Sequence, residues 1–369
     1  MKTLHALILF PLSAGCAGLR ETGVASDLSA IRSVGREGSG NAEASDAARR
    51  LSSLEASRLT EVLAAFDGAT PEARNWLRGV VEAIADRTVT EGRELPAKAL
   101  EAFVLDRSRD GKARRLAYDW LLRADPRACD RILPGALDDP SVEIRRDAVD
   151  REIRAAEELL AGEQADEARA AFARLLPFAR DRDQVERIAK KLEPLGETPN
   201  LTRHFGFIRT WRLAGPFDNT AKKGYAAVYP PEERIDFEAE HDGKTGKVRW
   251  VEHETQDAYG KVDLNKAIGK HMGAVAYAAA EFDSPHYRVA EIRAGSSNAV
   301  KIWLNGELVF TRDEYHHGMD PDQYRAAVEL RSGRNTILIK VCQNEGKEEW
   351  EQDWIFQLRV CDPTGGGIS

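Results

Sequence analysis

The spacing of apolar residues changes once along the chain, at a segment rich in Pro and Gly, residues 193–200. Before it, apolar residues recur three or four positions apart among Ala, Arg and Glu, the spacing that gives an α-helix one apolar face. After it, short runs alternate apolar and polar residues between turn residues, the pattern of half-buried β-strands. The sequence therefore predicts a helical part followed by an all-β part, with a boundary near residues 193–200.

Four segments follow from this change of period and from the composition of the N-terminus. At 369 residues the chain is long enough for two domains of about 150 residues. Residues 1–16 are expected to be an export or lipoprotein-type signal, and 17–50, rich in Gly, Ala, Ser and charge, a flexible spacer. We expect helical repeats over 51–196 and a β-sandwich over 206–362.

The N-terminal segment has the layout of an export signal. Lys2 precedes an apolar run of about 13 residues, too short for a bilayer span of roughly 20. Small residues lead to Cys16, and the segment 12–16 resembles a bacterial lipobox, with Leu12 one position further from the cysteine than usual. The resemblance implies an exported protein, periplasmic or a cell-envelope lipoprotein, that contacts a membrane only through lipidated Cys16. The alternative is a buried N-terminal strand or helix.

Charge and cysteine content exclude several classes of function. The formal net charge is −8, whereas a nucleic-acid-binding protein normally carries a basic surplus or stripe. The 4 cysteines are too few and too scattered for a disulfide framework or a zinc site. The expected partner is a neutral glycan or an envelope protein, and no nucleic acid.

The helical half has the pattern of stacked repeats. The segment 137–149 resembles the start of a HEAT repeat, in which an acidic-proline turn caps a helix and Val, Arg and Ala follow at helical spacing. The segment 165–172 is similar instead to a tetratricopeptide (TPR) helix, so the repeat class stays open. Either resemblance implies an α-solenoid, whose helices bury their apolar faces on neighbours and which commonly serves as a scaffold. A helical spacer with no partner is the alternative.

Turn signals separate the alternating runs of the β half, and Asn305-Gly306 between two of them indicates a tight hairpin. The segments 211–217, 295–307 and 333–341 resemble a galactose-binding-like jelly-roll module over about residues 206–361. The resemblance implies a jelly-roll β-sandwich of the kind that accompanies peptidases, glycosidases and haem-c domains in secreted bacterial proteins. The chain departs from the family at 295–299, where two carboxylates are missing. The predicted strands are 275–282, 287–293, 300–304, 308–311, 326–330, 336–342 and 354–360.

The alternation that begins at Val300 predicts which side chains leave the core. Lys301, Trp303 and Asn305 are expected to face outward. This combination suits a sugar, because the ring stacks on C–H faces while the polar groups bond hydroxyls. The loop 315–325 is rich in the same groups and completes the candidate site. The alternative is that a neighbouring segment covers Trp303 and that the loop only caps the sandwich. The candidate ligand-binding residues are Lys301, Trp303, Asn305, Tyr315, His316, His317, Gln323, Tyr324 and Arg325.

Metal binding by this loop is a separate hypothesis. Zinc would need His316 and His317 together with Asp320 or Asp322, but adjacent side chains on extended backbone point in opposite directions. Calcium would be held by Asp320, Asp322 and backbone carbonyls. No other cofactor is expected.

Cys342 and Cys361 are the remaining candidates for a covalent link. If 336–342 and 354–360 form a hairpin, Cys342 lies opposite residues near 354 and several positions from Cys361. The two Cα atoms then cannot come within the roughly 7 Å that a disulfide requires. We therefore expect no disulfide between them.

The sequence lacks the common catalytic signatures, among them Gly-x-Ser-x-Gly, His-Glu-x-x-His and the complete phosphate-binding loop Gly-x-x-x-x-Gly-Lys-Ser/Thr. We expect a non-catalytic exported envelope protein whose jelly roll binds carbohydrate and whose helical repeats act as a scaffold. One alternative is a protein–protein interaction scaffold with a purely structural jelly roll. Another is an accessory subunit of a secreted hydrolase.

Overall fold

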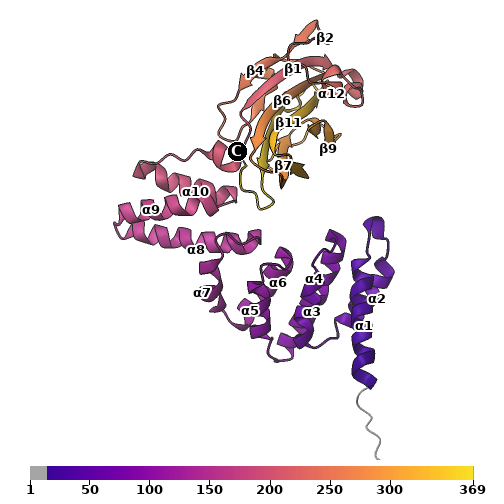
Figure 1. Cartoon of the computed structure of the whole chain (residues 1–369), viewed down its shortest axis with the longest axis vertical. Coiled ribbons are helices and arrows are strands. Elements are labelled where there is room, and N and C mark those ends of the chain that lie inside the picture. The colour runs from indigo at the N-terminus through magenta and orange to yellow at the C-terminus, as the bar shows by residue number, and fades with distance from the viewer. Residues whose placement is uncertain (1–14, 369) are drawn as a thin grey trace, which may run out of the picture. The chain divides into compact units, whose positions relative to one another are not determined.

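The computed structural model describes residues 15–368, with side chains from residue 23 onward. The chain forms two compact units, the first ending at Ala161 and the second beginning at Gly162 (Figure 1). The predicted order, helices first and antiparallel sheets second, is confirmed. Most of the predicted signal and the side chain of Cys16 lie outside the described residues. Between residues 15 and 368, no helix is long and apolar enough to cross a membrane.

The first unit consists of short helices, several of which begin at cap residues. Thr70 caps α4 (Pro71–Thr90) by accepting a hydrogen bond from the backbone N–H of Ala73 at 3.2 Å. Asp110 caps α6 (Gly111–Ala124) by accepting hydrogen bonds from the first-turn N–H groups. The other helices are α1 (Gly15–Arg32), η1 (Arg36–Gly38), α2 (Asn41–Leu51), η2 (Ala56–Arg58), α3 (Leu59–Ala64), α5 (Ala97–Leu105), α7 (Ala128–Ile132), η3 (Leu133–Gly135) and α8 (Val142–Ala161).

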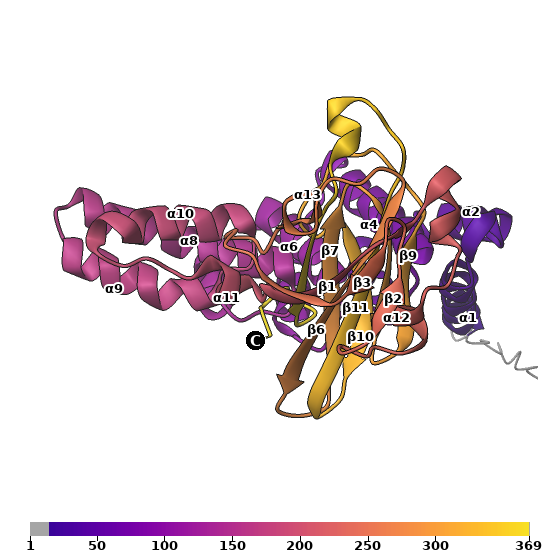
Figure 2. The ribbon, with the colours of Figure 1, turned by 90° about the horizontal axis from the view of Figure 1, so that it is seen from above.

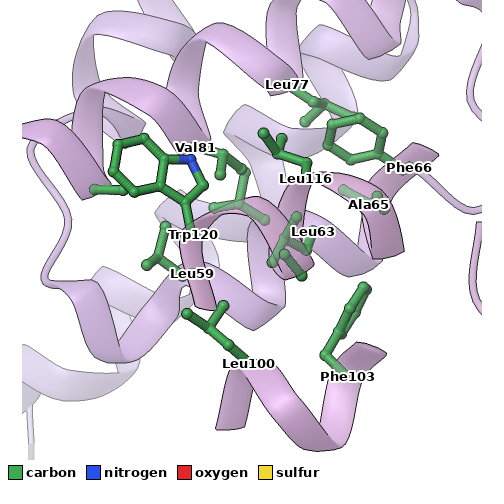
Figure 3. Packing of buried hydrophobic residues seen from close by; sticks show 14 of the residues in the cluster. Leu59, Leu63, Ala65, Phe66, Leu77, Val81, Leu100, Phe103, Leu116 and Trp120 are labelled. Atoms are coloured by element: carbon green, nitrogen blue, oxygen red, sulfur yellow. The ribbon is translucent and has the colours of Figure 1, made fainter. Parts of the chain in front are cut away.

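The helices of the first unit pack on one hydrophobic core, part of which Figure 3 shows. Helices α3, α4, α5 and α6 all contribute to it, because each presents apolar side chains at a spacing of three or four residues. No single helix of this length buries enough surface alone, so the core is shared between neighbours. The labelled contributors are Leu59, Leu63, Ala65, Phe66, Leu77, Val81, Leu100, Phe103, Leu116 and Trp120.

The expectation of a flexible spacer over 17–50 is wrong, because these residues form α1 and α2. Val24 and Ile31 of α1 are buried in the same core as the later helices. Arg50 of α2 forms an ion pair with Asp27 of α1. The Gly, Ala and Ser content hid apolar residues that stand at helical spacing, so composition was a poorer guide here than period.

A buried ion pair orders the chain before α8, the stretch that resembles a HEAT repeat. The carboxylate of Asp139 accepts hydrogen bonds from both terminal nitrogens of Arg114, at 2.7 and 2.8 Å. It also accepts one from the backbone N–H of Ser141 at 2.7 Å. Both charged side chains are buried, so neither can lose its partner without a large free-energy cost. The pair therefore fixes the connection between α6 and α8.

Helices α9 (Ala165–Leu175), α10 (Arg182–Leu192) and α11 (Leu201–Phe205), with η4 (Leu176–Phe178) and η5 (Glu193–Leu195), belong to the second unit. Tyr259 donates its hydroxyl hydrogen to Glu186 of α10, and its ring centre lies 4.4 Å from the guanidinium carbon of Arg182. Arg359 donates a hydrogen bond to the carbonyl of Phe205 at 3.0 Å. The sequence-based division placed α9 and α10 with the helical repeats, whereas their contacts group them with the strands.

The strands form two larger antiparallel sheets and a separate two-stranded sheet, β2–β3 (Figure 2). The 6-stranded sheet has the order β4-β1-β6-β11-β8-β9, and the 4-stranded sheet has the order β10-β7-β12-β5. The β2–β3 hairpin and the helices η6 (Thr220–Tyr225) and α12 (Pro230–Glu233) lie between β1 and β4 in the chain. The strands are β1 (Thr210–Asp218), β2 (Glu240–Asp242), β3 (Lys247–Arg249), β4 (Val251–Glu254), β5 (Val262–Asp263), β6 (Ala274–Ser284), β7 (Arg288–Ser296), β8 (Ala299–Leu304), β9 (Glu307–Arg312), β10 (Tyr324–Leu330), β11 (Gly333–Gln343) and β12 (Ile355–Cys361).

Each face of the six-stranded sheet has its own apolar cluster. Val300 of β8 belongs to the core that both sheets share, whereas Trp303 belongs to a second cluster on the opposite face, as the alternation predicted. This second cluster exists because the segment 219–254 covers the outer face and packs its aromatic side chains there. The predicted β8–β9 hairpin is also present, with Asn305 and Gly306 at φ of 52° and 85°.

The pairing assumed for the two C-terminal strands is wrong. β11 pairs with β6 and β8, whereas β12 pairs with β5 and β7 in the other sheet. The assumed hairpin fails because 344–354 is a long connection that crosses between sheets rather than a tight turn. Cys342 and Cys361 are both free thiols. They lie on strands of different sheets, and not on the two strands of one hairpin as assumed.

Candidate ligand-binding groove

Trp303 lies on the predicted face of β8 but is not an exposed platform. The residue is only 9% exposed, because side chains of the segment 219–254 pack against it. Lys301 is partly covered in the same way, with its ammonium group 4.7 Å from the ring centre of Tyr225. Strand parity decides which way a side chain points, but a distant segment decides whether it is covered. Trp303 therefore faces outward as predicted, but the expectation that it offers an open aromatic surface is wrong.

The predicted site residues do not come together in one place. Asn305 lies in the turn at one end of β8. The loop that contains Tyr315 follows β9, which returns antiparallel from that turn and ends beside the start of β8. The register places Val300 opposite Arg312, directly before the loop. The structure therefore separates the Trp303 and Asn305 pair from the loop residues by the length of β8.

Within the loop, His317, Gln323 and Tyr324 form one hydrogen-bonded group. The side-chain nitrogen of Gln323 lies 2.9 Å from Nδ1 of His317, and the Tyr324 hydroxyl lies 3.1 Å from its Nε2. Burial raises the pKa of Tyr324 to about 12, so the hydroxyl keeps its proton at neutral pH. These polar groups satisfy one another and order the loop. Arg325, the next residue of β10, is exposed.

Tyr315 and His316 contact a different set of residues. The Tyr315 hydroxyl accepts a hydrogen bond from the Asn219 amide at 3.3 Å, and burial raises its pKa. His316 contacts the Asn344 amide, and its ring centre lies 5.6 Å from that of Trp350 in an edge-to-face arrangement. Most of the polar atoms of this loop are thus engaged within the protein, while Trp350 itself is 61% exposed.

The calcium hypothesis is not supported by the position of Asp322. Its carboxylate accepts hydrogen bonds from Arg359 at 2.6 Å and from Arg293 at 3.0 Å. Burial alone would raise the pKa of Asp322, but the two arginines lower it, so the group stays ionised and paired. Asp320 is exposed. Nowhere in the described part of the chain do three or more His, Cys, Asp or Glu side chains gather as metal ligands.

A groove of about 440 Å³ lies on the outer face of the six-stranded sheet, and we name it the outer-face groove. Its floor is apolar and consists of Leu338 and the exposed edge of Trp303, with Ile235 and Phe237 beside them. An apolar floor with a few converging polar groups is typical of small-ligand sites. The polar lining residues are Glu232, Glu233, Arg234, Glu281, Asn305, Arg331, Arg334 and Thr336.

A buried charged cluster fixes the α12 wall of the groove. Lys340 of β11 is fully buried and donates hydrogen bonds to the Glu232 carboxylate at 2.7 Å and to the carbonyl of Ala227 at 2.6 Å. The Tyr277 hydroxyl donates to the same carboxylate. Burial lowers the pKa of Lys340, while the Glu232 carboxylate acts in the opposite direction. Glu232 is therefore engaged in holding α12 on the sheet.

The other end of the groove is built from two turns that Asn335 joins. This side chain is fully buried, and its Nδ2 donates to the carbonyls of Arg331 at 2.9 Å and Gly333 at 3.0 Å. Its Oδ1 accepts from the backbone N–H of Arg331 and from Asn305 Nδ2, both at 3.0 Å. Asn305 in turn accepts from the backbone N–H of Thr336 at 3.0 Å. The β8–β9 and β10–β11 turns are thereby held in one arrangement.

Of the residues that line this groove, the sequence predicted only Trp303 and Asn305 as binding residues. Arg331 and Arg334 stand in an ordinary turn, and no local pattern marks them as binding residues. The segment 219–254 did carry a signal, because it contains several aromatic residues without a strand pattern. Such a segment must bury its rings against something, and the outer face of a sheet was the available surface.

No protein-family model and no curated protein sequence matches the chain. Among solved structures, a beta-glucosidase from Kluyveromyces marxianus in complex with glucose is 14% identical, over 43% of this chain and 17% of its own, with a TM-score of 0.26. A beta-glucuronidase from an uncultured Clostridium sp. is 16% identical, over 42% of this chain and 28% of its own, with a TM-score of 0.27. A family 35 carbohydrate binding module from Clostridium thermocellum is 16% identical, over 24% of this chain and 71% of its own, with a TM-score of 0.18.

The chain thus spans less than a third of the length of the two hydrolases that it resembles. Identities and TM-scores this low describe a partial likeness and carry no conclusion about a ligand. What the groove binds has to be inferred from its own side chains.

Proposed function

We propose that this protein binds carbohydrate in the outer-face groove of its C-terminal unit. The observation that carries the proposal is the groove itself, about 440 Å³ in volume, with an apolar floor at Trp303 and Leu338 and amide, hydroxyl and charged groups around it. Its volume falls in the range of small-molecule sites, roughly 300–1,000 Å³. Sugars present the matching surface, because apolar C–H patches are edged by hydroxyls that donate and accept hydrogen bonds.

In this proposal the β part is a galactose-binding-like jelly roll and the helices are a HEAT-like or TPR-like α-solenoid that supports it. The antiparallel sheets of six and four strands and the shared core of neighbouring helices support both assignments. The protein acts as a non-catalytic exported module, held at the cell envelope through a lipidated Cys16. Glu232, the most buried carboxylate of the groove, is engaged by Lys340 and Tyr277, which favours binding over catalysis.

A groove-filling variant tests the proposal. Thr336 is half-buried and lines the groove, so Thr336→Trp places an indole in the space that a sugar ring would occupy. We expect the labelled full-length protein to bind a subset of a glycan array and the variant to lose that binding. Trp350→Ala is the matched control, because it removes an exposed aromatic ring outside the groove. Binding that survives Thr336→Trp, or that only Trp350→Ala abolishes, would contradict the proposal.

A second candidate function, a protein-binding scaffold, is favoured by a groove in the helical unit. This groove measures about 360 Å³ and is lined by Phe66 together with Arg78, Lys112 and Arg115 from α4 and α6. Apolar floors with arginine beside them are typical of protein interfaces. Crosslinking of the full-length protein in envelope extracts, compared with an Arg78→Glu and Lys112→Glu double variant, tests it. A partner captured equally by both proteins would count against this groove.

A further inference from the structure

Two arginines at one end of the outer-face groove have little to bind within the protein. In the described part of the chain, no hydrogen bond or ion pair engages the guanidinium group of Arg331; the bonds of this residue to Asn335 involve only its backbone N–H and carbonyl. Arg334 has one weak ion pair, with Glu281 at 3.9 Å, and its side chain is 71% exposed. Both side chains line the groove. Their donors are therefore available to a ligand.

The backbone that carries the two arginines is rigid. Arg331 and Arg334 flank the turn between β10 and β11, in which Gly333 has a φ of 82° that only glycine adopts easily. The buried Asn335 amide holds the turn through hydrogen bonds to the backbone on both sides. It also bonds Asn305, a third polar group at the same end of the groove. The backbone of the pair is therefore fixed before a ligand arrives, which lowers the entropy cost of binding.

The two ends of the groove carry different charge. Arg331, Arg334 and Asn305 gather at the end formed by the two turns, where Glu281 offsets one of the two positive charges, and Glu233 and Arg234 lie at the other end, in and directly after α12. The neighbouring Glu232 is neutralised by Lys340 and adds little charge. A ligand that matches this arrangement carries a negative group at one end and uncharged hydroxyls at the other.

We propose that the outer-face groove selects a sugar that carries a carboxylate, such as a uronic acid. This inference rests on the proposed carbohydrate function and narrows it from sugars in general to acidic ones. The planar guanidinium fork matches the two oxygens of a carboxylate and forms short, charge-assisted hydrogen bonds with them. The sugar ring lies over the apolar floor, with its hydroxyls toward Glu233 and Thr336. Because the chain as a whole is negative, this attraction is local and does not extend to polyanions in general.

NMR titration of the full-length protein tests the selection. The probes are the methyl glycosides of glucuronic, galacturonic and mannuronic acid, each beside its methyl ester, which keeps the ring and removes the charge. We expect at least one acid to bind about tenfold more tightly than its ester. The Arg331→Gln and Arg334→Gln double variant should lose that advantage and leave the affinity for the ester unchanged. Arg249→Gln, which changes an exposed arginine of β3 outside the groove, should behave like the wild type.

The outcomes separate this inference from the proposed function. If the esters bind as tightly as the acids, or if the double variant keeps the preference, the selection of a carboxylate is wrong and a neutral-sugar site remains. If galactose 6-sulfate competes equally with the acids, the site recognises negative charge rather than a carboxylate, and the inference fails in that form. If none of the acids, esters or neutral methyl glycosides binds, the proposed function fails as well. Equal thermal melting of all variants confirms that the fold is retained, as expected for exposed side chains.

Discussion

At the scale of single residues, the buried ion pair between Lys340 and Glu232 is where a small change has the largest effect on the groove. The side chains are 0% and 8% exposed. Removing one partner leaves the other charge buried without compensation, which typically costs about 3–5 kcal/mol. We expect Glu232→Gln to lower the free energy of unfolding by about 3 kcal/mol in urea denaturation and to weaken sugar binding, because α12 loses its anchor.

An exposed ion pair provides the control for this prediction. Lys247 and Asp242 lie 2.6 Å apart with side chains 59% and 90% exposed. Solvent screening makes such pairs worth roughly 0–1 kcal/mol. Asp242→Asn should therefore leave both stability and binding within error of the wild type. Equal losses in the two variants would show that the charge change itself, rather than burial, is responsible.

Asp322 makes the stability of the second unit depend on acid pH. Its bonds to Arg359 and Arg293 lower its pKa below the ordinary value of about 3.9, despite burial. The stabilisation is therefore complete above about pH 4 and is lost as the pH falls through the lowered pKa. Asp322→Asn should be less stable than the wild type by about 3 kcal/mol at pH 7 and by clearly less at pH 3.

Urea denaturation at the two pH values measures this difference. Asp320→Asn, at an exposed position two residues earlier, is the control and should follow the wild type at both pH values. A deficit of Asp322→Asn that stays constant between pH 7 and pH 3 would mean that the carboxylate does not titrate between them in the way described.

At the scale of elements, two glycines test whether backbone conformation alone decides the effect of a methyl group. A Cβ at Gly306 or at Gly79 would meet no atom within 4 Å. Gly306 has a φ of 85° in the β8–β9 turn, whereas Gly79 lies inside α4. Gly306→Ala should lower stability by about 1 kcal/mol, and Gly79→Ala should raise it by up to about 1 kcal/mol. Thermal melting measures both signs, and the same sign for both would contradict the reasoning.

The elements also show what sequence alone could predict. The expected strand 300–304 corresponds to β8 and 326–330 to β10, because alternation is a local property of the chain. The cover over Trp303 could not be predicted, because it comes from the segment 219–254, whose helices and strands are all short and lie far from β8 in the sequence. Arg331 reaches the groove through a turn that the long-range and local hydrogen bonds of Asn335 hold in place. Burial and site geometry therefore depended on long-range contacts that periodicity does not contain.

At the scale of the whole molecule, the net charge indicates which class of ligand is disfavoured, but it does not describe the charge inside the outer-face groove. The formal net charge of −8 disfavours nucleic acid and led to the expectation of a neutral glycan. Electrostatic recognition, however, depends on the charges within a few ångströms of the ligand, because charges further away are screened. Arg331 and Arg334 provide a positive end to the groove on a negative protein. A chain average therefore cannot exclude an acidic sugar, although it does disfavour a polyanion.

The division of the chain into units leads to a last prediction. We expect the fragment 162–369 to melt at least about 5 °C higher than the fragment 206–369. The shorter fragment lacks Glu186 and Arg182, which hold Tyr259, and it lacks the Phe205 carbonyl that accepts a hydrogen bond from Arg359. Arg359 is only 3% exposed, so a lost acceptor is not readily replaced by water.

The fragment 197–369 separates the two contributions, because it keeps α11 and removes α9 and α10. Its melting temperature should fall between the other two, since it regains the Phe205 carbonyl but not the partners of Tyr259. If all three fragments melt together, α9 and α10 contribute nothing to the β part, and the domain boundary belongs between residues 193–200, where the hydrophobic period changes, and residue 206, where the β-sandwich was expected to begin. A graded series would place it at Gly162 instead, and the helices would then be part of the module that carries the groove.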